Sequence, residues 1–101
     1  MKYCIDIDGT ICTQTADPKN RAYNNAKPLL KRIEIFNKLF DDGNYIIYYT
    51  ARGSSSGLDW GTFTKHQLSI WGVKYHKLVF GKPDADIFID DKAVNIKDFV
   101  K

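Results

Sequence analysis

The chain has few cysteines and no long apolar run, and each absence argues against a class of protein. Its 101 residues include two cysteines, Cys4 and Cys12, which are too few for a disulfide framework. The sequence has no stretch of about 18 apolar residues, so it predicts no membrane-spanning helix. The start, Met1-Lys2-Tyr3, runs directly into a strand-like segment without the apolar core of a signal peptide. We therefore expect a cytoplasmic enzyme or binding domain.

Strong charge of one sign and low-complexity sequence are also lacking. The formal net charge is +3, which is compatible with an anionic ligand but does not require nucleic acid. Without repeats or linkers, a chain of this length predicts a single domain over residues 1–101. Hydrophobic residues make up 44% and aromatic residues 14%, which indicates a folded core rather than a disordered chain.

The stretch C-I-D-I-D-G-T at residues 4–10 is the centre of our interpretation. The apolar run 3–7 predicts a strand, on which side chains at i and i+2 share a face, so Asp6 and Asp8 should emerge together at its end. Gly9 allows a sharp exit from the strand. Two adjacent carboxylates call for a cation or a shared proton, and their hard oxygens suit Mg²⁺. The alternative is a strand end that carries two solvated acids.

The rest of the chain predicts alternating strands and helices after a long loop over residues 11–27. Helical spacing of apolar residues indicates helices, and short apolar runs indicate strands. The predicted elements are a helix at 28–43, a strand at 44–49, a helix at 59–71, strands at 76–80 and 86–90, and a short helix or turn within 93–101. This order predicts an α/β fold with a mainly parallel sheet and right-handed crossovers. We expect helices on both faces of the sheet, Cys4 in the core, and Val94 and Phe99 packing inward from the tail.

Polar residues follow each predicted strand, at the edge where α/β sheets bind ligands. Together these clusters contribute four acids, one hydroxyl and one lysine: Asp6, Asp8, Thr50, Lys82, Asp90 and Asp91. A lysine and a metal ion can neutralise phosphoryl oxygens, and an aspartate can act as a nucleophile toward phosphorus. The alternatives are a capping role for Thr50 and a solvated loop position for Lys82.

Four motifs, in this order, resemble the haloacid dehalogenase-like (HAD) phosphohydrolase superfamily. They are D-I-D-G-T at 6–10, Thr50 at a strand end, G-K-P at 81–83 and I-D-D at 89–91. The stretches Y-T-A-R-G and G-K-P-D-A-D-I-F-I-D-D-K-A are similar to small HAD proteins of capsule or lipopolysaccharide biosynthesis. The resemblance covers nearly the whole chain. It implies a Rossmann-like HAD core, and the spacing between the motifs leaves no room for a separate cap domain.

The resemblance also implies an activity, that of a Mg²⁺-dependent phosphomonoester hydrolase that forms an aspartyl-phosphate. Asp6 would be the nucleophile and a metal ligand. Asp8 would be the general acid and then the base, with its backbone carbonyl on the metal. The phosphoryl group would be held by Thr50, Ala51, Arg52 and Lys82. The metal site would be completed by Asp90 and Asp91, of which Asp91 is the closer ligand.

A site without a cap is open, which suits either a large substrate or an oligomer whose neighbouring subunit acts as a lid. A sugar phosphate or a similar small metabolite is the substrate we expect. Basic residues that would contact the leaving group, if they are not plain surface charges, are Lys19, Arg21, Lys27 and Arg52.

Two other functions fit parts of the pattern. A polynucleotide 3′-end phosphatase would use the basic loop residues on the phosphate backbone. A receiver-type signalling domain also combines acids, a threonine and a lysine on a doubly wound sheet. Its adjacent acid pair would follow the first strand, whereas here the D-x-D comes first and the adjacent pair comes last. The order of the motifs therefore favours the hydrolase.

Overall fold

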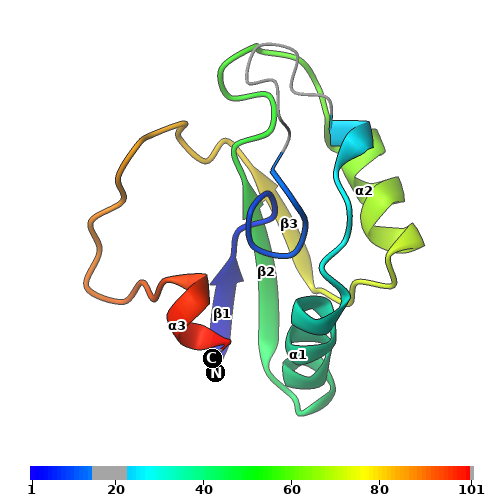
Figure 1. Ribbon diagram of the computed structural model, residues 1–101, viewed down its shortest axis with the longest axis vertical. Helices are drawn as coiled ribbons and strands as arrows, with labels where there is room; N and C mark the ends of the chain where they lie inside the picture. The colour runs from blue at the N-terminus through cyan, green and yellow to red at the C-terminus, as the bar shows by residue number, and fades with distance from the viewer. Residues whose placement is uncertain (15–22, 101) are drawn as a thin grey trace.

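A parallel three-stranded sheet forms the centre of the computed structural model, which describes residues 1–14 and 23–100 (Figure 1). The strands are β1 (Lys2–Ile5), β2 (Tyr45–Thr50) and β3 (Lys77–Phe80), and they lie in the order β1-β2-β3. In this register Ile5 pairs with Tyr48, and Tyr48 with Leu78. The predicted α/β class with a parallel sheet is therefore confirmed.

Helices connect the strands, close to where the apolar spacing predicts them. They are α1 (Leu30–Asp41), α2 (Gly61–Ile70) and the short α3 (Ile96–Phe99), with a 3-10 turn η1 (Tyr23–Asn25) inside the stretch 11–27 that the sequence predicts as a loop. Before α2, the Asp59 carboxylate accepts a hydrogen bond from the Gly61 backbone N–H at 2.8 Å, which satisfies a free amide at the helix start. None of the helices in residues 1–14 and 23–100 is long and apolar enough to cross a bilayer.

The core lies on one face of the sheet. Because side chains alternate along a strand, one set of strand residues packs against the helices and the other set points away. The buried cluster joins β1 and β2 to α1 and α2 through Ile5, Ile46, Tyr48, Ile33, Phe36 and Leu68. On the opposite face Cys4 is exposed, and Ile47 and Tyr49 are only half-buried. The expectations of helices on both faces and of a buried Cys4 are therefore wrong for the described residues.

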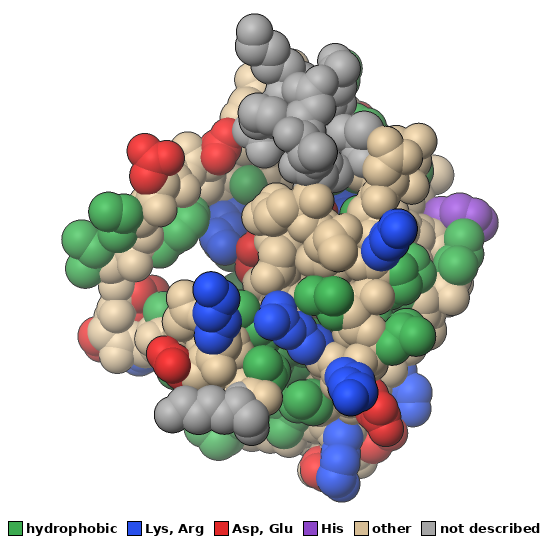
Figure 2. All heavy atoms as spheres, in the orientation of Figure 1, with side chains coloured by type: hydrophobic (Ala, Val, Ile, Leu, Met, Phe, Trp, Pro, Cys, Tyr) green, Lys and Arg blue, Asp and Glu red, His purple; other side chains and the backbone are tan. Residues whose placement is uncertain are grey.

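The strand predicted over residues 86–90 is not formed. This segment leaves β3 and runs outward from the sheet, shown in orange in Figure 1, and it pairs with none of the strands in the described part of the chain. Its side chains are exposed: Ile87 by 76%, Phe88 by 52% and Ile89 by 96%. Figure 2 shows green hydrophobic side chains at the left edge of the view, with open space between this part of the chain and the body of the molecule. A short apolar run becomes a strand only where a neighbouring strand accepts its hydrogen bonds.

The chain returns to the sheet at α3, which confirms the predicted short helix or turn within 93–101. The Asn95 side chain caps this helix by accepting from the Lys97 backbone N–H at 2.9 Å. The Phe99 ring then packs against Tyr3 of β1 and Phe36 of α1, with centroid distances of 6.2 and 5.7 Å. Val94 is exposed, so its predicted burial is wrong. The helix therefore docks through Phe99.

Candidate functional site

A tight turn after β1 presents the two acids of the first motif. The backbone N–H groups of Thr10 and Ile11 both donate to the Ile7 carbonyl, at 3.0 and 2.9 Å, and this folds the chain back directly beyond the strand. Gly9 adopts φ 82°, a conformation that glycine reaches without strain. Buried Ile7 anchors the turn, while the residues on either side, Asp6 and Asp8, line one hollow together. The prediction that these two acids emerge side by side is confirmed.

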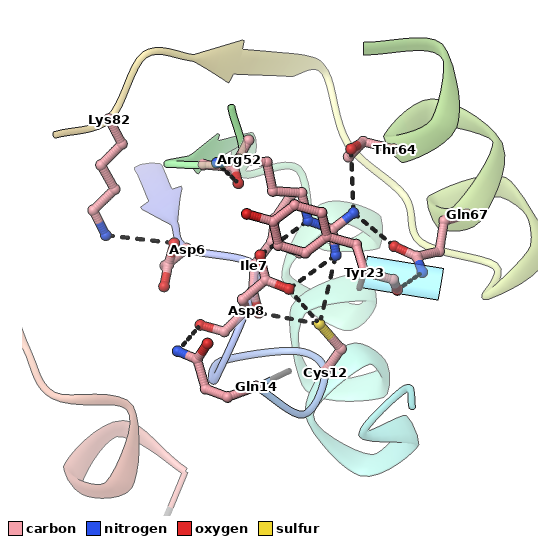
Figure 3. Close-up of polar contacts among 11 residues, drawn as sticks. Asp6, Ile7, Asp8, Cys12, Gln14, Tyr23, Arg52, Thr64, Gln67 and Lys82 are labelled. Atoms are coloured by element: carbon pink, nitrogen blue, oxygen red, sulfur yellow. Dashed lines mark hydrogen bonds and ion pairs between the residues drawn. The ribbon is translucent and has the colours of Figure 1, made fainter. Parts of the chain in front are cut away.

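Two further loops meet this turn at the carboxyl ends of β2 and β3. The Lys82 backbone N–H donates to the Thr50 carbonyl at 3.1 Å, and the Ser54 hydroxyl donates to the Lys82 carbonyl at 2.7 Å. These bonds hold the loop after β3 against the loop after β2. Because β1 is the neighbour of β2, Lys82 reaches across to the acids of the first turn. Figure 3 shows its ammonium group pointing at Asp6.

The hollow between these loops has a volume of about 150 Å³. Its lining combines the acids, a lysine, an arginine and two aromatic rings: Asp6, Asp8, Gln14, Tyr23, Ala51, Arg52, Lys82, Pro83, Asp84, Ala85 and Phe88. Thr50 is not among them. Its side chain is buried, and its hydroxyl oxygen accepts from the Arg52 backbone N–H at 3.1 Å. Thr50 thus has the capping contact that the sequence left as its alternative, whereas Ala51 reaches the hollow.

Among residues 1–14 and 23–100, Asp6 pairs with one cation, Lys82, and it remains partly open to solvent. Its Oδ1 lies 3.4 Å from Lys82 Nζ, and its side chain is 32% exposed. Burial raises the pKa of the Asp6 carboxyl above its usual value; Lys82 and the Ile7 N–H oppose this rise, and Asp8 adds to it. Lys82 Nζ also lies 4.6 Å from the centre of the Phe88 ring. A carboxylate oxygen of Asp6 is therefore accessible beside a positive charge.

Asp8 faces a different cation, Arg52, which is buried (Figure 3). Arg52 Nε donates to Asp8 Oδ2 and Arg52 Nη2 donates to Asp8 Oδ1, both at 2.9 Å. The Arg52 side chain is 0% exposed, so its interpretation as a surface charge is wrong. The sequence contains no signal for this pairing, because 44 positions separate the two residues. The two acids of the motif thus have separate cationic partners.

Cys12 and Gln14, which the sequence reading did not place in the site, also contact Asp8. The Cys12 thiol lies 3.4 Å from Asp8 Oδ1, and the Gln14 side-chain amide donates to the Asp8 carbonyl at 3.2 Å. Burial raises the pKa of the Cys12 thiol to about 12, and the negative charge of Asp8 acts in the same direction. Cys12 is therefore a neutral thiol at physiological pH, as expected for a buried cysteine that plays no nucleophilic part.

The second acid pair, Asp90 and Asp91, does not join the first. Both residues are exposed on the outward segment, and Asp90 Oδ1 accepts from the Lys92 backbone N–H at 2.7 Å. Among the described residues, no three acidic, histidine or cysteine side chains lie close enough to hold a metal ion. The four-acid set implied by the resemblance is therefore not assembled in this arrangement, and we assign no reaction step to a metal ion.

Of the three basic residues in the predicted loop 11–27, the described part of the chain includes only Lys27. Lys27 is exposed and does not line the hollow, while its backbone N–H donates to the Thr13 hydroxyl at 2.9 Å. Lys19 and Arg21, with the rest of 15–22, lie outside the described residues. Tyr23, directly after that segment, does line the hollow.

We compared the chain with protein families, curated sequences and solved structures, and found similarity to a solved structure. No protein-family model matches the chain, and no curated protein sequence matches it. A crystal structure of a target protein from Vibrio cholerae is similar, with a TM-score of 0.80 and 28% sequence identity. The match covers 98% of this chain and 86% of that one. The chain therefore shares an α/β fold with the Vibrio cholerae protein over almost its whole length.

Proposed function

We propose that the chain is a phosphomonoester hydrolase that forms an aspartyl-phosphate on Asp6, with a sugar phosphate or a similar small metabolite as substrate. One observation carries the proposal: the partly exposed Asp6 carboxylate lies in a hollow, 3.4 Å from Lys82 and two residues before a second acid. An accessible carboxylate beside a cation suits attack on a phosphoryl group, whose negative oxygens the lysine would attract. The resemblance of four motifs to HAD phosphohydrolases points the same way.

In the first step, an Asp6 carboxylate oxygen attacks phosphorus and the bond from phosphorus to the ester oxygen breaks. The departing alkoxide takes a proton from Asp8 and leaves as an alcohol, so this step requires the protonated form of Asp8 and produces its carboxylate. Lys82, beside Asp6, stabilises the negative charge of the transferring group. The products of the step are the free alcohol and phosphorylated Asp6.

In the second step, water attacks the same phosphorus and Asp8 accepts a proton from that water. The bond from phosphorus to the Asp6 oxygen breaks, which releases inorganic phosphate and restores both acids to their starting forms. Asp8 is suited to serve both steps because it lies next to the nucleophile in the sequence pattern and lines the same hollow. The cycle consumes one water molecule and needs no oxidant or reductant.

Mg²⁺ is the cofactor that the resemblance implies, and we include its requirement in the proposal as a point to be tested. Bound beside Asp6, the ion would neutralise charge on the phosphoryl oxygens. Asp90 and Asp91 are the further acids expected to hold it, although here they lie apart from Asp6. A second subunit that covers the open hollow is the partner we expect.

The test is phosphate release from phosphosugars, nucleotides and 3′-phosphorylated oligonucleotides, each with Mg²⁺ and with a chelator. We expect Mg²⁺-dependent release, highest with one class of phosphosugar. Preference for the oligonucleotide, with a steep loss of rate as salt is raised, would instead favour the polynucleotide end phosphatase. No release from any compound by the wild-type chain would contradict the proposed hydrolase.

The Asp6→Asn variant checks the assigned nucleophile. An amide cannot form the acyl-phosphate, so we expect turnover to fall by about 10³-fold or more while the fold is kept. Asp42→Asn is the matched control, because Asp42 is an exposed acid that pairs with Lys38 at the end of α1. It should turn over at the wild-type rate. Wild-type turnover by Asp6→Asn would show that another group attacks phosphorus.

A further inference from the structure

We infer that Arg52 is the positioning residue for Asp8 and that helix α2 sets the orientation of Arg52. This role rests on the proposed function, because it concerns the residue that exchanges protons in that reaction. In this arrangement Arg52 holds the Asp8 carboxylate in place, and side chains of α2 hold Arg52. The α2 side chains act on Asp8 only through Arg52.

The contact between Arg52 and Asp8 fixes the direction of the carboxylate. Arg52 Nε and Nη2 each donate to a different Asp8 oxygen at 2.9 Å, so the flat guanidinium and the flat carboxylate meet along two parallel hydrogen bonds. A two-bond contact of this kind allows little rotation of either group, unlike a contact through one ammonium. The Asp8 side chain is 15% exposed, which leaves part of it open toward the hollow.

The opposite end of the guanidinium is held by α2. Arg52 Nη1 donates to Gln67 Oε1 at 2.7 Å and to Thr64 Oγ1 at 3.2 Å (Figure 3). Thr64 and Gln67 are three positions apart, so they lie on the same face of the helix. Both are buried. Any rotation or shift of α2 would therefore move Arg52, and Arg52 would carry Asp8 with it.

Tyr23 also contacts both Arg52 and Gln67. Its ring centre lies 4.5 Å from the Arg52 guanidinium carbon, and its backbone carbonyl accepts from Gln67 Nε2 at 2.8 Å. Gln67 thus uses its oxygen to hold Arg52 and its nitrogen to hold the residue that covers Arg52. The orientation of the guanidinium is set by three segments of chain, at Tyr23, at Arg52 and on α2.

The same contacts argue against direct binding of phosphate by Arg52. An arginine has five N–H groups, and here each one points to an acceptor in the protein. The weakest of the five contacts is from Nη2 to Cys12 Sγ at 4.0 Å; the others go to Asp8, Thr64 and Gln67. Of the two described cations that line the hollow, Lys82 is therefore the one that would face the phosphoryl group, and Arg52 acts through Asp8.

The test separates alignment of Asp8 from a general structural effect by comparing two leaving groups. An alkyl phosphate releases an alkoxide that needs a proton from Asp8, whereas p-nitrophenyl phosphate releases a stable phenolate that does not. Release of each leaving group is measured in the first turnover for Arg52→Lys and Gln67→Met. Lys65→Met is the control, because Lys65 is exposed on the same helix and does not line the hollow.

In both variants we expect alcohol release to fall by about 10- to 100-fold and nitrophenolate release to fall by less than about threefold, with KM nearly unchanged. Gln67→Met keeps the Asp8–Arg52 pair itself and serves as the test if Arg52→Lys does not fold. Equal losses with both esters, or no loss with either, would overturn the positioning role alone. A wild-type chain that cleaves neither ester would overturn the proposed function, and the role of Arg52 with it.

Discussion

Tyr48 shows how strongly one residue is constrained in this small core. It lies in the middle of β2, it is fully buried, and its hydroxyl has no hydrogen-bond partner among the described residues. A buried polar group without a partner costs about 1–3 kcal/mol of stability. The ring also contacts Tyr75 edge to face, with a centroid distance of 6.0 Å. The ring of Tyr48 thus stabilises the core, while its hydroxyl opposes folding.

We predict that Tyr48→Phe raises the free energy of unfolding by about 1 kcal/mol at pH 7, because the ring stays and the unpaired hydroxyl goes. Urea denaturation measures the difference. Tyr45→Phe is the control: Tyr45 is 40% exposed, so its hydroxyl is open to water, and we expect little change. A loss of stability in Tyr48→Phe would mean that the hydroxyl has a partner in solution.

The same substitution should change the response to alkali. Burial raises the pKa of the Tyr48 hydroxyl above its usual value of about 10. Below that pH, the folded and unfolded states both keep the proton. Above it, the unfolded state loses the proton while the folded state retains it, so the free energy of unfolding falls as pH rises. Tyr48→Phe removes this contribution, and its stability should fall less than that of the wild type between pH 9 and 11.

The loop over residues 51–58 has little freedom to change. Gly53 adopts φ 84°, and a Cβ at this position would press against the Leu58 backbone carbonyl. The Gly57 N–H donates back to the Gly53 carbonyl at 2.8 Å, which closes the loop on itself. Because Ala51 and Arg52 begin this loop, its shape also determines one wall of the hollow.

We predict that Gly53→Ala lowers the free energy of unfolding by about 1–2 kcal/mol from the left-handed backbone and by about 1–3 kcal/mol more from the clash. The matched variant is Gly57→Ala. Gly57 adopts φ 74°, but a Cβ there would meet no heavy atom within 4 Å, so only the first cost should apply. Equal losses in thermal or urea unfolding would show that the loop moves aside and that the close approach is not limiting.

For single elements, the sequence predicted features that depend on residues close in sequence. It did not predict features that depend on contacts with residues far away in sequence. Helical spacing and flanking residues placed the helix at 28–43 close to the observed Leu30–Asp41, because those signals lie within the helix itself. The i and i+2 rule placed Asp6 and Asp8 correctly for the same reason. The partner of Asp8 could not be predicted, since the burial of Arg52 depends on contacts with α2 and Tyr23, both distant in sequence.

For the molecule as a whole, the main difference from expectation is the outward course of residues 81–95. We predict that Ile89→Ser changes the free energy of unfolding by less than about 0.5 kcal/mol, because Ile89 is 96% exposed. Ile46→Ala, at a fully buried position of β2, should cost about 2–5 kcal/mol in the same urea titration. A cost for Ile89→Ser close to that of Ile46→Ala would show that residues 86–90 are packed as a strand after all.

The order of the strands also determines when the site can form during protein synthesis. In the sheet β1, β2 and β3 follow one another as they do along the chain, so each strand leaves the ribosome after the strand it pairs with. The sheet can therefore grow during synthesis at one edge only. Asp6 is made directly after β1, and Lys82, its cation, is made only after β3. A nascent chain thus carries Asp6 once β1 has been made but gains the complete Asp6–Lys82 pair only after β2 and β3 have followed.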